Sequence, residues 1–368
     1  MTEILLQQLN SQDWQWIKLN GERQSVRAKE SLIQQQKNVD RLYLIISGEF
    51  AAVIIAQAKK GILGSAFAAL EDSSDLEREI ARLGDGEVIG EMSFLDLSPA
   101  ANTYTAVKDS LVLGIPRDRL KRKLEQDTGF AARFYRAIAI LLTERFEHLG
   151  DLYLRNRMGK LDALQDVPTL FGELKDSDVD WMVHQGVIQE IAPGEILTKV
   201  GRQVENFYII LQGTMSLMVS EAKQNKVSSI FAALELDNDR SDLEREIAQL
   251  SRGEIIGETT AFDSFLSPTT VQTQGNSLVL AISRDKLLIK LQQDPAMAAR
   301  LYRVVAIMLS GRIQGLISRL GFGKDSYQFG QSLSADTEYE DEIDLAVMDN
   351  IFLGGARFDW MLKRLRVS

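Results

Sequence analysis

One eight-residue segment occurs twice in this chain, 167 residues apart. Residues 74–81 read Ser-Asp-Leu-Glu-Arg-Glu-Ile-Ala, and residues 241–248 repeat them letter for letter. A Gly-Glu-x-Ile-Gly-Glu turn follows each copy, at residues 86–91 and 253–258. Chance rarely produces eight identical residues at one offset, and self-similarity at a fixed period indicates duplicated structural units. The chain therefore contains two copies of one domain.

The repeat also predicts the fold of each copy. Residues 42–48, 110–113 and 130–136 match residues 207–213, 277–280 and 297–303. The first half of each copy consists of short apolar runs broken by Gly, Asp and Asn, a pattern typical of an all-β barrel or sandwich. Residues from 127 to about 157, and from 294 to about 320, carry apolar side chains at helical spacing. We expect a mainly β protein with α-helix: two tandem β-rolls, each followed by a long helix.

Composition limits the class of protein. Of 368 residues, 45% are hydrophobic and 26% charged, which is ordinary for a soluble protein. The absence of Cys excludes disulfides, zinc–thiolate sites and thiol catalysis, and fits a cytoplasmic location. The net charge of -10 opposes direct binding to DNA or anionic lipid. No apolar run reaches the roughly 20 residues that span a bilayer. We find no catalytic residue set, and expect neither an enzyme nor a cofactor.

The element order resembles the cyclic-nucleotide-binding domain family, the fold of the cAMP receptor protein. The likeness lies in a strand ending in Ser-Gly or Gln-Gly, the Gly-x-x-x-Gly-Glu turn, a Ser-Pro loop, a closing strand and the helices. In that family, the segment after the second Gly-Glu is a phosphate-binding cassette. Its Glu holds the ribose 2′-hydroxyl, and an Arg after the Pro pairs with the phosphate. The resemblance implies that Glu91 and Glu258 are ligand-binding residues.

Both copies depart from the family at this cassette. The position after the Pro holds Ala100 in the first domain and Thr269 in the second, and residues 97–107 and 264–274 contain neither Arg nor Lys. A cyclic monophosphate would lose a charged hydrogen bond worth about 1.5–3 kcal/mol. We therefore expect no ordinary cAMP or cGMP binding. Glu91 and Glu258 could equally be retained for turn geometry alone.

Two insertions are the second departure. Residues 57–75 and 221–241 stand where the family has a tight hairpin, and both contain Phe-Ala-Ala-Leu-Glu. Long loops inside compact domains are usually functional or disordered, and the repeated apolar pentapeptide favours a functional loop over a disordered one. Each insertion could plug its own barrel, or could build a relocated ligand surface beside Arg78 and Arg245.

Four arginines complete the candidate site. Arg78, Arg133, Arg245 and Arg300 recur at matching positions of the two copies. Arginine matches phosphate bidentately and stacks on purine rings, so paired arginines from two domains suit an anionic ligand. The alternative for Arg133 and Arg300 is a solvated helix face.

The remaining residues divide the chain. We expect domains at 1–157 and 158–321, followed by residues 322–368 as an acidic linker and an amphipathic tail. The tail interleaves apolar residues with Arg and Lys, so it could dock on a partner or on its own domains. It is too short for the helix-turn-helix of the family's transcription factors.

Duplication suggests an internal dimer. In the family, two chains pair through their long helices; here the helices beginning near Phe130 and Pro295 could pair within one chain. A two-fold groove suits a two-fold ligand such as cyclic di-GMP. The architecture is similar to cyanobacterial cyclic di-GMP receptors, which signal to a partner transcription regulator of the cAMP-receptor-protein type. We expect a receptor that binds cyclic di-GMP and signals through a protein partner. A ligand-free scaffold with relic sites and a cAMP or cGMP sensor are the alternatives.

Overall fold

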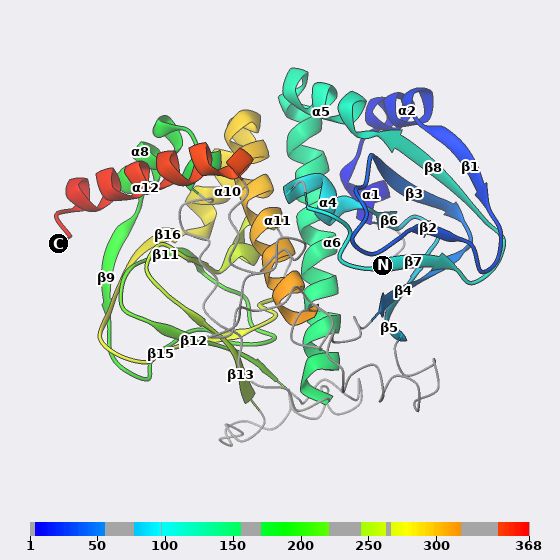
Figure 1. The fold of residues 1–368 in the computed structure, drawn as a ribbon. Coiled ribbons are helices and arrows are strands. Elements are labelled where there is room, and N and C mark those ends of the chain that lie inside the picture. The colour runs from blue at the N-terminus through cyan, green and yellow to red at the C-terminus, as the bar shows by residue number, and fades with distance from the viewer. Residues whose placement is uncertain are drawn as a thin grey trace.

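The computed structural model describes residues 4–55, 77–96, 98–155, 171–220, 244–262, 266–317 and 345–367. Within them the predicted fold is confirmed: two β-rolls, each followed by a long helix, lie side by side (Figure 1). Both insertions lie outside the described residues, as do the acidic run and the two expected domain boundaries.

The first domain has two helices, eight strands, a short helix and two closing helices. In order they are α1 (Ile4–Gln8), α2 (Ser11–Asn20), β1 (Glu22–Val26), β2 (Ser31–Ile33), β3 (Arg41–Ser47), β4 (Glu49–Ile55), β5 (Glu77–Gly84), β6 (Val88–Ile89), α4 (Glu91–Asp96), β7 (Thr103–Ala106), β8 (Ser110–Pro116), α5 (Arg117–Gln126) and α6 (Thr128–Arg155). The strands form two antiparallel sheets, in the orders β1-β8-β3-β6 and β2-β7-β4-β5.

The second domain repeats this plan. Its elements are α8 (Asp176–Gln185), β9 (Val187–Ile191), β10 (Ile196–Thr198), β11 (Asn206–Gln212), β12 (Met215–Ser220), β13 (Glu244–Leu250), β14 (Ile255–Ile256), the 3-10 helix η4 (Glu258–Ala261), β15 (Thr270–Thr273), β16 (Ser277–Ser283), α10 (Arg284–Gln293) and α11 (Pro295–Ile317). The sheet orders, β9-β16-β11-β14 and β10-β15-β12-β13, match those of the first domain strand for strand. Where the first domain has α4, the second has a 3-10 turn.

Alternation along the strands sends apolar side chains between the two sheets. In β4, Phe50 and Ile54 are completely buried, and their equivalents Met215 and Val219 in β12 are also buried. Full burial of such a side chain contributes about 1.5–3 kcal/mol. These interiors fix the strand register and therefore the position of each cassette.

The two long helices begin at matching aspartates. Asp127 Oδ1 accepts the backbone N–H of Phe130 at 2.9 Å, and Asp294 Oδ1 accepts that of Met297 at 3.0 Å. An aspartate in this position satisfies one of the backbone donors that a helix leaves free at its start.

The helices then pair with each other, which confirms the internal pairing expected from the duplication. Helices α6 and α11 form the most extensive helix contact among the described elements and run alongside one another between the β-rolls (Figure 1). Helix α11 also contacts α4 of the first domain. There, Gln314 Nε2 and Ser310 Oγ donate to Asp96 Oδ2 at 2.6 and 3.3 Å. One cassette helix is thus hydrogen-bonded to the long helix of the other domain.

The tail forms helix α12 (Leu345–Leu365), which contacts α8 of the second domain. The amphipathic tail therefore docks on its own chain. No helix in the described ranges combines the length and the apolar character needed to cross a membrane.

Candidate functional site

Each cassette starts at a position whose backbone conformation favours glycine. Gly90 and Gly257 have φ of +92° and +76°, in the left-handed region. A Cβ on Gly90 would also lie 3.0 Å from the carbonyl oxygen of Arg41. The turn places the next residue, Glu91 or Glu258, at the beginning of α4 or η4.

The two glutamates of each Gly-Glu-x-Ile-Gly-Glu turn have different roles. Glu87 accepts the backbone N–H of Gly84 at 2.6 Å, and Glu254 accepts that of Ser251. The first glutamate therefore holds the turn. The second glutamate, Glu91 or Glu258, binds a side chain outside the turn. A role in turn geometry alone therefore does not account for its contacts.

That partner is an arginine from the domain's own long helix. Arg145 of α6 donates through Nη1 to Glu91 Oε1 and through Nη2 to the carbonyl of Val88, the latter at 2.6 Å. Arg312 of α11 repeats the arrangement, with Nη1 at 3.0 Å from Glu258 Oε1 and Nη2 at 3.3 Å from the carbonyl of Ile255. Each cassette is thus tied to the helix that pairs the two domains.

Both ion pairs are shielded from solvent. Glu91 and Glu258 are 1% and 5% exposed, and Arg312 is 2% exposed. Burial raises the pKa of the Glu91 carboxyl above its ordinary value, and the charge of Arg145 opposes that rise. The arginine compensates for the desolvation of a carboxylate that would otherwise be unpaired in the interior.

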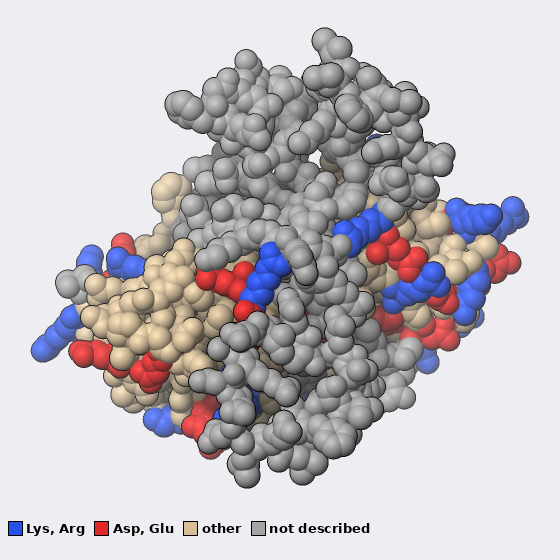
Figure 2. All heavy atoms as spheres, turned by 90° about the horizontal axis from the view of Figure 1, so that it is seen from below, with Lys and Arg blue, Asp and Glu red and all other residues tan. Residues whose placement is uncertain are grey.

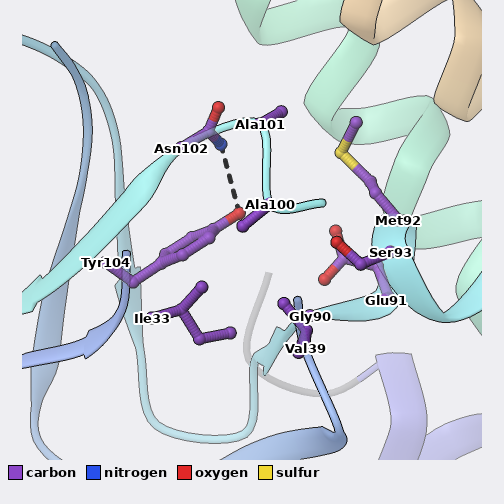
Figure 3. A pocket seen from close by; sticks show the side chains of 10 residues that line it. All are labelled: Ile33, Val39, Gly90, Glu91, Met92, Ser93, Ala100, Ala101, Asn102 and Tyr104. Carbon is purple, nitrogen blue, oxygen red and sulfur yellow. Dashed lines mark hydrogen bonds between the residues drawn. The ribbon is translucent and has the colours of Figure 1, made fainter. Parts of the chain in front are cut away.

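The first cassette lines a small pocket (Figure 3). Its interior volume of about 10 Å³ matches roughly one water molecule. Two buried acceptors in its wall, Glu91 Oε2 and Asn102 Oδ1, accept no hydrogen bond from any residue that the structure describes. Ten residues line the pocket, none of them Arg or Lys: Ile33, Val39, Gly90, Glu91, Met92, Ser93, Ala100, Ala101, Asn102 and Tyr104. The pocket therefore offers hydrogen-bond acceptors and no cation for a phosphate.

Tyr104 forms the polar end of this pocket. Its hydroxyl accepts from Asn102 Nδ2 at 3.2 Å, as Figure 3 shows. Burial, together with the nearby charge of Glu91, raises the pKa of Tyr104 to about 12. The phenol therefore stays neutral and can still donate a hydrogen bond.

The second cassette differs at these positions. Strand pairing sets Tyr104 opposite Ile33 and Val271 opposite Thr198, so Val271 replaces the tyrosine and Thr269 replaces Asn102. The hydroxyls there bond inward: Thr198 Oγ1 and Ser267 Oγ both donate to the carbonyl of Thr269, at 3.3 and 2.7 Å. The duplicated cassettes are therefore chemically unequal.

Backbone pairing also corrects the alignment of the missing arginine. The carbonyl of Ala100 accepts from Gln36, and that of Ser267 accepts from Gly201 in the matching loop. Ala100 is thus equivalent to Ser267 rather than to Thr269. The proline had misaligned the second loop by two residues, although neither position carries a cation.

Arg78 and Arg245 lie near the starts of β5 and β13, next to the insertions. Arg78 is opposite Ile54 and Arg245 is opposite Val219, so both arginines share the face of a buried residue. Both are half-buried. The Arg78 guanidinium makes no hydrogen bond or ion pair to another described residue.

The strand that pairs with the start of β13 lies close to the first domain. Val219, the cross-strand neighbour of Arg245, contacts α6, since a methyl group added at Gly150 would be 3.6 Å from Val219 Cγ1. The start of β13 therefore adjoins the junction between the two domains.

Arg133 and Arg300 have partners inside the protein. Each guanidinium binds an aspartate with two hydrogen bonds: Arg133 binds Asp13 at 2.6 and 2.9 Å, and Arg300 binds Asp178 at 2.6 and 2.8 Å. These aspartates also cap α2 and α8. Both arginines hold an N-terminal helix on a long helix, and could bind a ligand only by giving up that bond.

Sequence reasoning missed Arg145 and Arg312. A signal for them exists: the two residues are identical at the offset of 167 that relates the copies, as are Glu91 and Glu258.

On one face of the molecule, described basic side chains lie beside acidic ones rather than in one basic region (Figure 2).

Several known proteins are similar to this chain. PfPKA-R bound to cAMP has 16% sequence identity and a TM-score of 0.29, over 79% of this chain and 80% of that one. The guanosine-bound regulatory subunit of a cAMP-independent protein kinase A from Trypanosoma cruzi has 17% identity and a TM-score of 0.27, over 80% and 82%. A cyclic nucleotide-binding domain from Methylobacillus flagellatus has 22% identity and a TM-score of 0.36, over 44% and 84%.

Lysophospholipase NTE1 of Yarrowia lipolytica is 25% identical over 95 residues. That stretch is 25% of this chain and only 7% of the lipase's length. The sequence profile of the cyclic nucleotide-binding domain matches residues 23–127 and 188–294, which run from β1 to the start of α6 and from β9 to the end of α10. The two matches cover more than half of the chain and both β-rolls, and the chain therefore belongs to the cyclic nucleotide-binding domain family.

Proposed function

We propose that this chain is a non-catalytic second-messenger receptor that binds cyclic di-GMP and signals to a protein partner. The observation that carries the proposal is the pairing of α6 with α11, each of which holds its own cassette through the same Arg–Glu bond. Two units of the same fold in one chain match a ligand built from two equivalent halves. Domains of this family are typically regulatory, and we propose a regulatory role here.

The cassettes themselves favour a ligand other than a cyclic mononucleotide. A cyclic monophosphate in the first pocket would place its negative charge near Glu91, with no basic residue in the lining to compensate. The pocket in this conformation also has room for about one water. The phosphates of the proposed ligand need cations elsewhere.

We place those cations at Arg78 and Arg245. Both are half-buried at matching strand starts, and Arg245 adjoins the junction with α6 through Val219. A half-buried guanidinium loses less hydration on binding than a fully solvated one, and it binds phosphate with two parallel hydrogen bonds. We propose that these two arginines bind the phosphates.

The proposed signal passes through the cassette glutamates. A ligand hydroxyl that donates to Glu91 Oε2 shares this carboxylate with Arg145, which donates to Oε1, and one that bonds Glu258 shares that carboxylate with Arg312. Since both arginines lie on the paired helices, any change in these bonds alters the contact between the two domains.

Calorimetric titration with cyclic di-GMP and with cAMP tests the proposal. We expect binding of the dinucleotide and none of cAMP, and at least a tenfold loss of affinity in the double variant Arg78→Ala/Arg245→Ala. Arg82→Ala is the matched control, because Arg82 lies on the same strand but pairs with Glu49 and Glu79 on the outer surface. Unchanged affinity in the double variant refutes this site.

A ligand-free scaffold is the second candidate, and the same geometry favours it. Internal arginines already fill the partner role at both glutamates, as expected of relic sites. This candidate predicts no thermal shift with any nucleotide. Binding of cAMP alone would instead identify a cyclic-mononucleotide sensor.

A further inference from the structure

Helix α12 is fixed on the second domain by one of its faces. Arg357 donates to Asp176 Oδ1 at 2.7 Å and to the carbonyls of Phe171 and Gly172 at 3.1 and 3.0 Å. The Phe358 ring lies 5.2 Å from that of Phe171. Buried Met361 and Leu362 continue this inner face. The helix is therefore a fixed part of the domain surface.

Its opposite face presents apolar side chains to solvent. Phe352 is 70% exposed and Trp360 is 43% exposed, with exposed Ala356 midway between them. Residues four apart lie on one helix face, so the three form a continuous stripe. Leu353 borders it and is also exposed. Among the described Phe and Trp residues, Phe352 and Trp360 are the two that are exposed, and both lie on α12.

The stripe ends in a basic cluster. Lys363, Arg364 and Arg366 are all exposed, on a chain whose net charge is -10. Basic residues in a last helical turn also stabilise the helix dipole, which would account for the charge alone. The dipole gives no reason to keep Phe352 and Trp360 in water.

The size of the stripe favours an enclosing groove over a flat contact. Stable interfaces use about 20–30 residues a side, far more than one stripe supplies in a helix-to-helix contact with a second copy. When an amphipathic helix binds in a groove, the groove encloses its anchor side chains, which recur every three to four residues along the helix.

We propose that the outer face of α12 is the docking surface for a different protein, one that offers an apolar groove bordered by carboxylates. The groove takes Phe352 and Trp360 as anchors, and its carboxylates pair with Lys363 and Arg364. This inference rests on the protein partner of the proposed function, and it does not depend on which nucleotide binds.

A photo-crosslinking side chain at position 356 identifies the partner in cells that express the chain. The crosslinked protein is then purified and titrated with the whole chain. We expect Phe352→Ala/Trp360→Ala to weaken binding at least tenfold. We expect Lys363→Glu/Arg364→Glu to weaken it as well, with a loss that shrinks at high salt.

The control is Leu19→Ala/Ile289→Ala, which removes exposed apolar side chains from α2 and α10. It should leave partner binding unchanged. Thermal unfolding and helical circular dichroism should be unchanged in the variants that replace exposed apolar residues by Ala. Lys363→Glu/Arg364→Glu opposes the helix dipole, so we expect a small decrease in the unfolding midpoint for that variant alone.

Three results would overturn the proposal: a crosslink between two copies of this chain, no crosslink from position 356, or a purified partner that binds the α12 variants as it binds the wild type. Cyclic di-GMP titrations of the same variants separate the two proposals. A chain that binds no dinucleotide, yet needs Phe352 and Trp360 for its partner, would sink the ligand assignment and retain the docking surface.

Discussion

The buried bond between Glu258 and Arg312 makes a sharp stability prediction. Arg312→Met leaves an uncompensated carboxylate at a site only 5% exposed, which typically costs about 3–5 kcal/mol. Glu258→Leu in the same chain removes that charge, so the double variant should recover much of the loss. Urea unfolding of the single and double variants measures both effects. Equal losses in the two would show that the ion pair is not what the fold depends on.

The first cassette gives a second residue-level prediction. Asn102→Leu removes the acceptor Oδ1, which accepts no hydrogen bond from a described residue, and also the Nδ2 donor of the buried Tyr104 hydroxyl, so we expect a stability loss of about 0.5–1.5 kcal/mol. If the pocket binds a ligand hydroxyl, the same change should weaken cyclic di-GMP binding. Thr269→Val in the second cassette is the matched control, since that side chain is not part of the pocket. Calorimetry and thermal unfolding distinguish a ligand contact from a packing defect.

Individual residues show why the site was only partly predictable. The Gly-Glu turns were visible because their residues are consecutive. The partner of Glu91 lies 54 residues further on, at Arg145, and no local pattern links the two. Likewise Arg133 resembles a solvated helix residue until the fold brings Asp13 to it. Pairings between distant residues require the tertiary structure, although identity at the repeat offset marks the residues that take part.

Among the elements, the long helices depend on their aspartate caps. The hydrogen bond from Lys123 and the N–H of Phe130 hold the pKa of Asp127 below its ordinary value. The N–H of Met297 and Lys290 do the same for the pKa of Asp294. A lowered folded-state pKa means that this stabilisation is present above the unfolded pKa of about 3.9 and is lost as pH falls through the folded value.

We therefore expect Asp127→Ala to cost about 1 kcal/mol at pH 7. Asp127→Asn keeps the capping acceptor and should cost less at pH 7. It should also remove this residue's share of the stability lost between pH 4 and pH 2. Urea unfolding across that range measures the difference. An unchanged acid transition in the Asn variant would contradict the assignment.

Element types followed from the sequence more readily than element details. Apolar spacing predicted both long helices and the amphipathic tail because each buries one side against a domain. The 3-10 form of η4, where the first domain has α4, carried no comparable signal: the segments Glu-Met-Ser-Phe and Glu-Thr-Thr-Ala have the same polarity at three of four positions. The β-branched Thr259 has a lower helix propensity than Met92 at the matching position, but packing decides which type of helix forms.

At the scale of the whole molecule, the hydrogen bond between Gln314 and Asp96 joins the two domains, and its removal tests how strongly they are coupled. Gln314→Glu replaces the donor at 2.6 Å from Asp96 by a second carboxylate, which removes a charged hydrogen bond and adds repulsion. We expect a loss of about 1–3 kcal/mol at pH 7. Lys18→Glu, a charge change on α2 away from this contact, is the control. Calorimetric unfolding that stays a single transition of unchanged midpoint would show that this bond does not join the domains.

The fusion of two pairing domains has a consequence for dosage. A receptor assembled from separate subunits dissociates as its abundance drops, so its threshold drifts with expression level. Here the second half is covalently supplied, at an effective concentration on the order of millimolar, however dilute the protein becomes. Covalent linkage also frees the halves to diverge, as Tyr104 and Val271 already have. If the chain is the receptor that we propose, a cell holding few copies would therefore respond at the same messenger level as one holding many.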